Sequence, residues 1–424
     1  MQRIFSLHNS LNSELTKPEL KNHYTTGDGR GKNVLLTGGT GFVGDLIIKR
    51  YLERTDCALW IISRPRGNIS AKERILNRID IQYHNRIKIL EGELGRRVDD
   101  KGIDINAYMG LDDKNNKNNY DKFRQMVEVV DEVFHNGSYL GLKNDAVERG
   151  RCMDINILGT QRIFNIISLF KRPLKALFYT STAFVHGIMS EPQEFGEDTA
   201  FPGRWLNPYE ESKWRAEILI RNSGYPFRIF RPGVIAKEID TPVLSSHTIY
   251  GVANVIESGY YNYRKKNPEK PVHIVLEGES GSAHNIMLRS DLVDMIFDIR
   301  ESDHGMNHVY NTVNTHNTLL SDVLYAILYN LEPGMTYQFV PRYSEGHIKN
   351  IIEEYIHKMV MPIYKGYLFK SSPEHRMDNV IKALGEDYLS DNITKINRET
   401  LVKLMKDHFE KKKPKNGLSR SCHT

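Results

Sequence analysis

The segment Thr37-Gly-Gly-Thr-Gly-Phe-Val-Gly44 constrains the fold more than any other part of the chain. A short apolar run, 33–37, leads into it, and an amphipathic stretch, 45–53, follows. Its glycines allow a tight turn, close approach of the backbone to a pyrophosphate and close packing of the next helix on the sheet. A strand–loop–helix order is the context in which such a loop binds a dinucleotide. We therefore expect cofactor contacts from Thr37, Gly38, Thr40, Gly41, Phe42, Val43 and Gly44.

β-type and helical segments alternate along the next two hundred residues. Several apolar runs have no polar face, as expected for strands that are buried on both faces of a parallel sheet. The pattern predicts an α/β protein with a Rossmann-type doubly wound parallel sheet. The expected strands are 33–37, 58–62, 86–90, 132–134, 175–179 and 227–230, and a strand at 308–312 returns to the same sheet. Helices are expected at 319–331 and 398–409.

Composition indicates a globular protein and argues against nucleic acid as a partner. The 424 residues are 40% hydrophobic and 26% charged, which is typical of a globular chain with two to three domains. The net charge of +5, from 58 basic and 53 acidic residues, is too small and scattered to indicate nucleic-acid binding. The three cysteines are far apart, and no apolar run reaches the ~18–20 residues of a membrane span. We expect a cytoplasmic protein with no membrane span and no metal site.

The alternation of β-type and helical segments becomes weaker after about residue 236, which indicates a domain boundary near this position. We expect a flexible N-terminal lead at 1–32, a dinucleotide-binding domain at 33–240 and a disordered basic tail at 411–424. Residues 241–300 and 316–410 then form a smaller C-terminal α+β region.

The residues after the second expected strand indicate which dinucleotide binds. That strand ends in Ile62-Ser-Arg-Pro-Arg66, where a carboxylate would accept hydrogen bonds from a free ribose hydroxyl. Guanidinium groups at this place favour a 2′-phosphate instead. We therefore predict NADP(H) as the cofactor, with Arg64 as the phosphate ligand and Arg66 as a solvent-facing side chain.

Three polar residues further along the chain have the pattern of a carbonyl-reducing site. Tyr209 and Lys213 are four residues apart at the start of an expected helix, so they share one face. A nearby ammonium stabilises a phenolate and brings a tyrosine closer to use as a proton donor. Thr182 follows a buried strand, at the edge of the sheet where ligands bind. We expect Thr182, Tyr209 and Lys213 to be catalytic.

Taken in order, these motifs resemble the extended short-chain dehydrogenase/reductase family over about residues 33–315. The closer resemblance is to its thioester-reductase and fatty-acyl-CoA-reductase (male-sterility) branch. The residues that carry it are the glycine loop, Glu91-Gly-Glu-Leu94, Val133-Phe-His-Asn136, Asn156-Ile-Leu-Gly-Thr160, Ser181-Thr182, Asn207-Pro-Tyr-Glu-Glu-Ser-Lys213, Arg231-Pro-Gly233 and Tyr310-Asn-Thr-Val-Asn314.

The resemblance implies a role for each matching residue. Thr182 would polarise the carbonyl, Tyr209 would transfer the proton, and Lys213 would bind the nicotinamide ribose. Asn156 would have a structural role near the cofactor, and His186, which replaces a common tyrosine, would form part of the wall. The remaining implied cofactor contacts are Glu93 and Leu94 near the adenine, Asn136 and Gly137 along the cofactor, and Pro232 and Gly233 at the nicotinamide.

The resemblance also implies the reaction. Hydride from NADPH would reduce an acyl thioester, bound to coenzyme A or to a carrier protein, to an aldehyde or an alcohol. A sugar-nucleotide epimerase, an aldehyde or ketone reductase, and a non-catalytic NADP-binding regulatory protein remain alternatives. Dehydration is disfavoured because Ala183 and Phe184 stand where a dehydratase carries carboxylates.

By the same resemblance, 241–300 and 316–410 would form a substrate cap over the nicotinamide. Its tyrosines would line an acyl pocket or belong to an ordinary aromatic core: Tyr250, Tyr260, Tyr261 and Tyr263. Arg264, Lys265 and Lys266 would receive the phosphates of coenzyme A or an acidic acyl-carrier protein supplied in trans, or form a solvated face. The sequence leaves open the acyl chain length, the carrier, two- or four-electron reduction, and whether the protein forms a homodimer.

Overall fold

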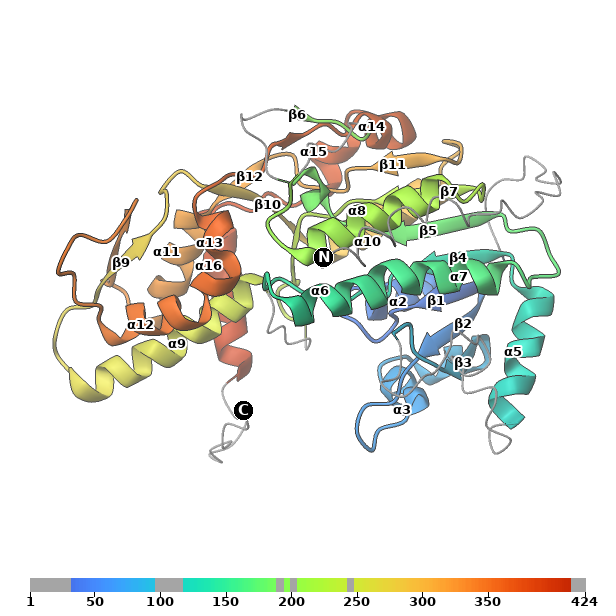
Figure 1. Cartoon of the computed structure of the whole chain (residues 1–424), viewed down its shortest axis with the longest axis horizontal. Coiled ribbons are helices and arrows are strands. Elements are labelled where there is room, and N and C mark those ends of the chain that lie inside the picture. Colours follow the sequence, from blue (N-terminus) through green and yellow to red (C-terminus); the bar gives the residue numbers. More distant parts are fainter. Residues whose placement is uncertain (1–31, 96–116, 188–193, 199–203, 242–247, 413–424) are drawn as a thin grey trace, which may run out of the picture.

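A computed structural model describes residues 32–95, 117–187, 194–198, 204–241 and 248–412. Figure 1 shows a large part built around one sheet and a smaller, mainly helical part beside it, which we call the cap. Residues 1–31 of the predicted N-terminal lead at 1–32, and residues 413–424 of the predicted tail, lie outside the described residues.

A seven-stranded parallel sheet forms the centre of the large part. Its order is β11-β7-β5-β4-β1-β2-β3, and every neighbouring pair is parallel. The chain therefore builds outward in two directions from β1, and ligands bind at such a reversal point in open α/β sheets. This confirms the predicted doubly wound sheet. The strands are β1 (Asn33–Thr37), β2 (Ala58–Ser63), β3 (Ile87–Glu91), β4 (Glu132–His135), β5 (Ala176–Thr180), β7 (Phe227–Phe230) and β11 (His308–Tyr310).

Helices cover both faces of this sheet. One buried cluster joins it to α2 (Gly44–Arg54), α3 (Ala71–Leu76) and α10 (Arg289–Glu301). A second cluster joins the opposite face to α5 (Lys117–Val129), α7 (Gly159–Ile167) and α8 (Pro208–Arg221). The short helix α6 (Ala146–Cys152) continues into a π-helical turn, Met153–Leu158, before α7. Both faces are covered, which agrees with the largely apolar runs seen in the sequence. The polar residues of the central strands, such as Glu132 of β4 and Arg228 of β7, are buried.

The cap packs helices against small sheets. Strands β8 (Val234–Ala236), β10 (Ala283–Leu288) and β12 (Asn317–Leu319) form one sheet, and β9 (His273–Glu277) pairs with β13 (Thr336–Val340). A short pair joins β6 (Glu194–Phe195) to β14 (Glu374–His375) near the large sheet. The cap helices are α9 (Thr248–Lys266), α11 (Leu320–Leu331), α12 (Ile351–Met359), α13 (Met361–Leu368) and α16 (Arg398–Lys412).

The two parts do not divide along the chain as the sequence predicted. Helix α10 lies in the segment assigned to the cap, yet its Leu292 is buried against the large sheet. Two more helices, α14 (Asp378–Leu384) and α15 (Tyr388–Asn392), place Val380 and Leu389 in the same cluster. Helix α16 also includes Lys411 and Lys412, which we had assigned to the tail. The physical reason is that α10, α14 and α15 bury their apolar faces on the large part, which composition along the chain does not reveal.

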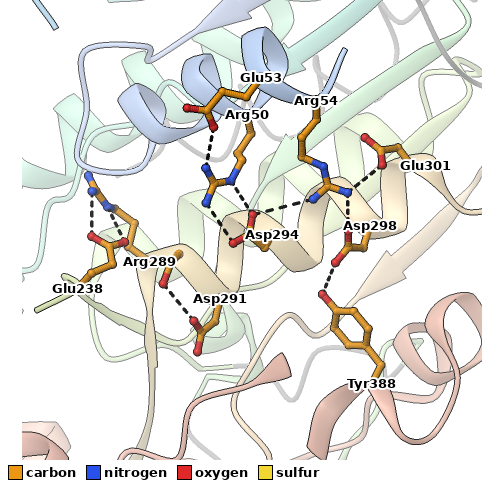
Figure 2. Close-up of polar contacts among 11 residues, drawn as sticks. Arg50, Glu53, Arg54, Glu238, Arg289, Asp291, Asp294, Asp298, Glu301 and Tyr388 are labelled. Atoms are coloured by element: carbon orange, nitrogen blue, oxygen red, sulfur yellow. Dashed lines mark hydrogen bonds and ion pairs between the residues drawn. The ribbon is translucent and has the colours of Figure 1, made fainter. Parts of the chain in front are cut away.

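Ion pairs reinforce the contact between α2 and α10. Figure 2 shows Arg50 and Arg54 of α2 reaching carboxylates of α10. Arg50 Nε lies 2.6 Å from Asp294, and Arg54 Nη2 lies 2.5 Å from Asp298. Tyr388 of α15 donates a hydrogen bond to the same Asp298 at 2.5 Å. Since α2 follows the glycine loop directly, this network fixes the helix on which a bound pyrophosphate would rest.

Candidate active site

The glycine loop turns sharply between β1 and α2. Gly38 has a φ of +73°, and a Cβ there would lie 2.6 Å from the backbone nitrogen of Gly137. A Cβ at Gly44 would lie 2.0 Å from the carbonyl oxygen of Gly38. Both positions thus require glycine, one for its backbone conformation and both for the close approach of neighbouring chain. The turn leaves the start of α2 free to face an anion.

The end of β4 packs against this loop. Gly137 donates its backbone N–H to Thr37 Oγ1 at 3.0 Å, and Asn136 Nδ2 lies 3.4 Å from the carbonyl oxygen of Gly38. His135 is buried, and its Nδ1 lies 2.7 Å from Thr37 Oγ1. The predicted contacts at β1 and β4 therefore lie side by side at the point where the strand order reverses.

One cavity of about 740 Å³ runs from the glycine loop into the cap. Most of the predicted site residues line it, whereas Gly44, Asn156 and Lys213 do not. The predicted residues in its lining are Thr37, Gly38, Thr40, Gly41, Phe42, Val43, Arg64, Glu93, Leu94, Asn136, Gly137, Thr182, Tyr209, Pro232 and Gly233.

Arginine side chains gather at the β2 end of the cavity. Arg64, 67% exposed, lies 3.2 Å from Glu93. Arg74 bridges the same region, donating to the carbonyl oxygen of Arg64 at 2.5 Å and to Thr40 Oγ1 at 3.0 Å. Burial, and next the positive charges of Arg64, Arg66 and Arg78, lower the pKa of Arg74. Arginines this close repel one another, so an anion bound among them relieves the repulsion.

The predicted site did not include Arg74. Arg66, which we predicted to face solvent, also lines the cavity. A signal for Arg74 was present in the sequence. Ser70 and Glu73 form a capping box that starts α3, and this fixes where the last turn of that short helix points. An interpretation of this segment as a short helix would have placed Arg74 next to the glycine loop.

Tyr209 and Thr182 meet at the middle of the cavity. Asn207 caps α8 by accepting the Glu210 backbone N–H at 3.1 Å, and Pro208 occupies the first turn. This places Tyr209 in the first turn, where it is hydrogen-bonded to Thr182. Burial raises the pKa of Tyr209. A hydroxyl pair held in this way can donate two hydrogen bonds to one carbonyl oxygen.

Lys213 lies one turn further along α8 and is fully enclosed. Its Nζ donates to the carbonyl oxygen of Thr180 at 2.5 Å and lies 4.2 Å from the centre of the Tyr179 ring. Burial lowers the pKa of Lys213 to about 7. The ammonium is therefore sensitive to any change in charge nearby, since little solvent screens it.

Asn156 acts on the backbone rather than on the cavity. Its amide exchanges hydrogen bonds with both backbone groups of Tyr139, at 2.7 and 2.9 Å. Its Nδ2 also donates to Ser212 Oγ at 2.8 Å, and Ser212 donates to the carbonyl oxygen of Tyr209. The π-helical turn projects Asn156 between these partners. Asn156 thereby links the backbone of Tyr139 to that of Tyr209 through Ser212.

His186 does not line the cavity. It is buried beside His375 and Phe195, and its Nδ1 lies 2.6 Å from the carbonyl oxygen of Gly187. Burial lowers the pKa of His186 to about 4. The residue that faces the cavity from this turn is Phe184.

Three residues that the sequence did not single out join the cap to α8. Tyr367 of α13 donates its hydroxyl hydrogen to Glu210 and accepts from Asn207 Nδ2 at 2.7 Å. Glu210 is 1% exposed, and burial raises its pKa to about 7. His284 of β10 contacts the Tyr367 ring and, like Tyr367, lines the cavity. Only folding brings these residues together, because Glu210, His284 and Tyr367 are each more than seventy positions from the next along the chain.

The cap residues proposed for substrate contacts lie elsewhere. The four tyrosines Tyr250, Tyr260, Tyr261 and Tyr263 are not in the described lining of the cavity. Tyr250 is buried and accepts the backbone N–H of Lys237, so the ordinary-core interpretation holds for it. Arg264 pairs with Glu332 and donates to three nearby carbonyl oxygens, which turns it away from an external phosphate.

The described residues contain no group of three or more side chains placed to hold a metal ion. Within the same ranges, no helix combines the length and the apolarity that crossing a bilayer needs.

Comparison with family models matches residues 36–276, more than half of the chain, to an NAD-binding family described as male sterility protein. The chain is 26% identical over 289 residues to the fatty acyl-CoA reductase wat of Drosophila melanogaster, covering 58% of this chain and 52% of that protein. It is 28% identical over 225 residues to a carboxylic acid reductase of Mycobacterium tuberculosis, covering 48% and 18%. It is equally similar, at 28% over 225 residues, to the nonribosomal peptide synthetase asaC of Aspergillus flavus, covering 48% and 19%. The chain thus spans about half of the first and about a fifth of the other two.

Solved structures show the same fold. The terminal R domain from the myxalamid PKS-NRPS biosynthetic pathway superposes with a TM-score of 0.66 at 18% identity, covering 91% of each chain. A UDP-glucuronic acid 4-epimerase from Bacillus cereus has a TM-score of 0.56 at 14% identity, covering 90% of this chain and 99% of that one. At these identities the likeness concerns the fold alone.

Proposed function

This chain belongs to the male sterility family of NAD-binding proteins, and from that premise we propose that it is an NADPH-dependent reductase of acyl thioesters. The reaction consumes an acyl thioester, NADPH and a proton, and gives an aldehyde, a free thiol and NADP⁺. A second reduction gives the alcohol. The observation that supports this most is that one cavity contains both the glycine loop and the Thr182–Tyr209 hydroxyl pair.

The residues present fit a bound NADP(H), whose nicotinamide supplies a hydride. The glycine loop and the start of α2 would receive the pyrophosphate, because the backbone N–H groups at the start of a helix bind anions. Arg64 and Arg74 would hold the 2′-phosphate between them, which supports NADP over NAD. Pro232 and Gly233, which also line the cavity, would lie beside the nicotinamide.

At the reacting carbonyl, the hydroxyl pair would perform the chemistry. Thr182 and Tyr209 would donate hydrogen bonds to the carbonyl oxygen as negative charge develops there, and Tyr209 would deliver the proton. Lys213, held against the Thr180 carbonyl, would stabilise the phenolate that remains. Expulsion of the thiol then leaves the aldehyde.

The alternatives share part of this machinery. A sugar-nucleotide epimerase also needs a tyrosine, a lysine and a threonine, but its substrate is polar. Beyond the hydroxyl pair, the cavity is lined by aliphatic side chains of the cap, such as Ile249, Val323 and Ile356. A sugar would bury hydroxyl groups there without partners, which supports the acyl thioester over the sugar.

The test is to supply NADPH with acyl-CoA, acyl-carrier, aldehyde and sugar-nucleotide substrates, and to follow the absorbance of NADPH while trapping aldehydes. Thioesters should be reduced, and Tyr209→Phe should lower kcat at least a hundredfold while leaving the Kd for NADPH unchanged, with the hundredfold taken from the lower range of general acid catalysis. Turnover of a sugar nucleotide without any thioester reduction, or equal turnover by Tyr209→Phe, would overturn the proposal.

A further inference from the structure

One tyrosine of the cap, Tyr367, contacts both of the chain segments that carry the hydroxyl pair. It lies on α13, more than 150 residues after Tyr209 in the chain, and its side chain lines the cavity. The two segments are the first turn of α8, which carries Tyr209, and the short turn Ala183–His186, which begins directly after Thr182. Two parts of the same side chain make the two contacts.

The hydroxyl of Tyr367 is held at the first turn of α8. It donates to one carboxyl oxygen of Glu210 and accepts from Asn207 Nδ2 at 2.7 Å. Asn207 caps α8, and the other carboxyl oxygen of Glu210 accepts the backbone N–H of Leu206 at 2.9 Å. These partners all lie within three positions of Tyr209 in the chain. The start of the helix that carries Tyr209 is therefore tied to the cap.

Little solvent reaches these hydrogen bonds. Asn207 is 3% exposed and Glu210 is 1% exposed. Gly366 allows α13 to come this close, because a Cβ there would lie 2.6 Å from Leu206 Cδ2. When one partner of a buried hydrogen bond is lost, the other partner is left unsatisfied at a cost in free energy. Without the Tyr367 hydroxyl, the first turn of α8 would move until its polar groups found other partners.

The ring of Tyr367 packs on the turn that follows Thr182. Its centre lies 5.5 Å from that of the Phe184 ring at an interplanar angle of 86°, which is an edge-to-face contact. Phe184 donates its backbone N–H to Thr182 Oγ1 at 3.3 Å. His284 of β10 packs on the Tyr367 ring from the cap, with the ring centres 5.5 Å apart. The ring thus supports the segment of Thr182, while the hydroxyl supports the segment of Tyr209.

We propose that Tyr367 is a positioning residue, whose ring and hydroxyl together set where Tyr209 lies relative to Thr182. Donors stabilise a developing oxyanion only from about 2.7–3.1 Å, so a small displacement of Tyr209 lowers the rate of the chemical step more than it weakens binding. The inference rests on the proposed function, because it takes Tyr209 as the proton donor. It adds that the cap helps to assemble the catalytic site as well as enclosing the substrate.

The test begins with Tyr367→Phe, which removes the hydroxyl and keeps the ring. With NADPH and an acyl-CoA that wild type reduces, we expect kcat to fall about tenfold or more, since a misplacement of about 1 Å can cost a hundredfold. The KM for the acyl-CoA and the Kd for NADPH should stay unchanged, because the ring still lines the cavity. This division between kcat and KM distinguishes a positioning role from a substrate contact.

Tyr337→Phe is the matched control. Tyr337 is another cap tyrosine, and its hydroxyl donates to the carbonyl oxygen of Ser321 at 2.9 Å. It lies outside the described lining of the cavity. The variant therefore also loses one hydroxyl hydrogen bond, but that bond lies within the cap. It should leave kcat, KM and the Kd for NADPH unchanged.

A second variant reaches the same contact from α8. Serine caps helices about as well as asparagine, so Asn207→Ser keeps the cap of α8. It loses the amide group that donates to the Tyr367 hydroxyl. We expect kcat to fall about threefold or more, as the loss of one hydrogen bond implies, again with unchanged KM.

A double variant separates the positioning of Tyr209 from a general structural role. If Tyr367 acts through the Tyr209 hydroxyl, adding Tyr367→Phe to Tyr209→Phe should lower the remaining kcat less than about twofold. A further readout needs no turnover. In protein labelled with fluorotyrosine, the fluorine NMR resonance of Tyr209 is assigned by its absence from Tyr209→Phe. Tyr367→Phe should shift this resonance, and Tyr337→Phe should leave it in place.

The outcomes separate the two proposals. If thioesters are reduced and Tyr367→Phe leaves kcat unchanged, or lowers it as much in the Tyr209→Phe background as in wild type, the positioning role is overturned and the proposed function stands. An equal loss of kcat in Tyr337→Phe also overturns the positioning role, because the effect would not be local. If Tyr367→Phe does not fold, an unchanged kcat in Asn207→Ser overturns it.

If wild type reduces no thioester, the proposed function is overturned and the fluorine spectrum tests the positioning role by itself. A Tyr209 resonance that moves in Tyr367→Phe but not in Tyr337→Phe then supports the contact between the cap and α8. A resonance that stays in place in both variants overturns it.

Discussion

The Arg289 guanidinium donates a hydrogen bond from Nη1 to the carbonyl oxygen of Phe42 at 2.9 Å. The same side chain pairs with both carboxylate oxygens of Glu238 and with Asp45, and it is 5% exposed. Figure 2 shows the pair with Glu238, which follows β8 where the chain leaves for the cap. One buried arginine thus connects the glycine loop to the start of the cap.

We expect Arg289→Lys to weaken NADPH binding about tenfold or more. A lysine keeps the charge but lacks the planar fork, so it cannot hold Phe42 and Glu238 together. Losing one charged hydrogen bond, about 1.5–3 kcal/mol, corresponds to that change in Kd. Arg398→Lys is the control, since Arg398 pairs with Asp322 within the cap and does not contact the loop. The Kd for NADPH is measured by fluorescence titration. Equal values for wild type and Arg289→Lys would contradict the predicted role of Arg289 in cofactor binding.

Arg74 should determine the preference for NADPH over NADH. Its side chain bridges Arg64 and Thr40, so Arg74→Ala removes one ligand of a 2′-phosphate and loosens the other. We expect the ratio of kcat/KM for NADPH to that for NADH to fall about tenfold or more, as the loss of a charged hydrogen bond implies. Lys72→Ala, an exposed change on the same helix, should leave the ratio unchanged. A preference that survives both Arg74→Ala and Arg64→Ala would place phosphate recognition elsewhere.

Glu210 should make stability depend on pH. Burial raises its pKa from 4.5 in the unfolded chain to about 7 in the folded protein. A carboxyl group with a raised pKa contributes stability that is complete below pH 4.5 and is lost as the pH rises through about 7. The loss amounts to about 3 kcal/mol for a shift of this size.

Glu210→Gln keeps the shape and removes the titration. Urea unfolding at pH 5 and at pH 8 should therefore show a larger fall in the free energy of unfolding for wild type than for the variant. Glu197 also has a raised pKa, but it is present in both proteins and cancels in the difference. Parallel pH dependence in the two proteins would show that Glu210 remains ionised in the folded state.

The pair between Lys237 and Asp407 should be essential for the cap. Both side chains are buried, and Asp407 also accepts the backbone N–H of Asp240 at 3.1 Å. Removing one member of a buried pair leaves an uncompensated charge, so Asp407→Asn should cost about 3–5 kcal/mol in the free energy of unfolding. Glu399→Gln, which breaks the exposed pair with Lys403 on the same helix, should cost less than about 1 kcal/mol. Similar losses in the free energy of unfolding for Asp407→Asn and Glu399→Gln would show that the Lys237–Asp407 pair is not essential for the cap.

The sequence predicted the central sheet well because each strand carries its own signal. The runs at 33–37 and 227–230 match β1 and β7 exactly in extent, and the strand at 308–312 joins the sheet as β11 over its first three residues. Buried parallel strands are apolar on both faces, so local composition was sufficient for them. The order of the motifs along the chain singled out Thr182 after a buried strand and Tyr209 at a helix start, and their side chains are hydrogen-bonded to each other.

Residues that act across the fold were harder to find. Tyr367 meets Glu210 from a helix more than 150 residues away, and no local pattern marks either residue. We considered the cap tyrosines as the lining of an acyl pocket because aromatic residues are large. The lining of the cavity in the cap is instead mostly aliphatic and comes from helix faces such as that of Ile327. Which face of a cap helix turns inward depends on its packing partners, and those are set by tertiary structure.

Strand β11 closes one edge of the seven-stranded sheet although it follows most of the first cap segment in the chain. The polypeptide then returns to the cap, comes back as α14 and α15 on the large part, and enters the cap again as α16, the last described helix. No single cut can release an intact cap or an intact sheet. We infer that the two parts unfold as one cooperative unit. A shortened fragment ending before β11 would leave β7, which is otherwise paired on both sides, as the exposed edge of the sheet and would tend to self-associate.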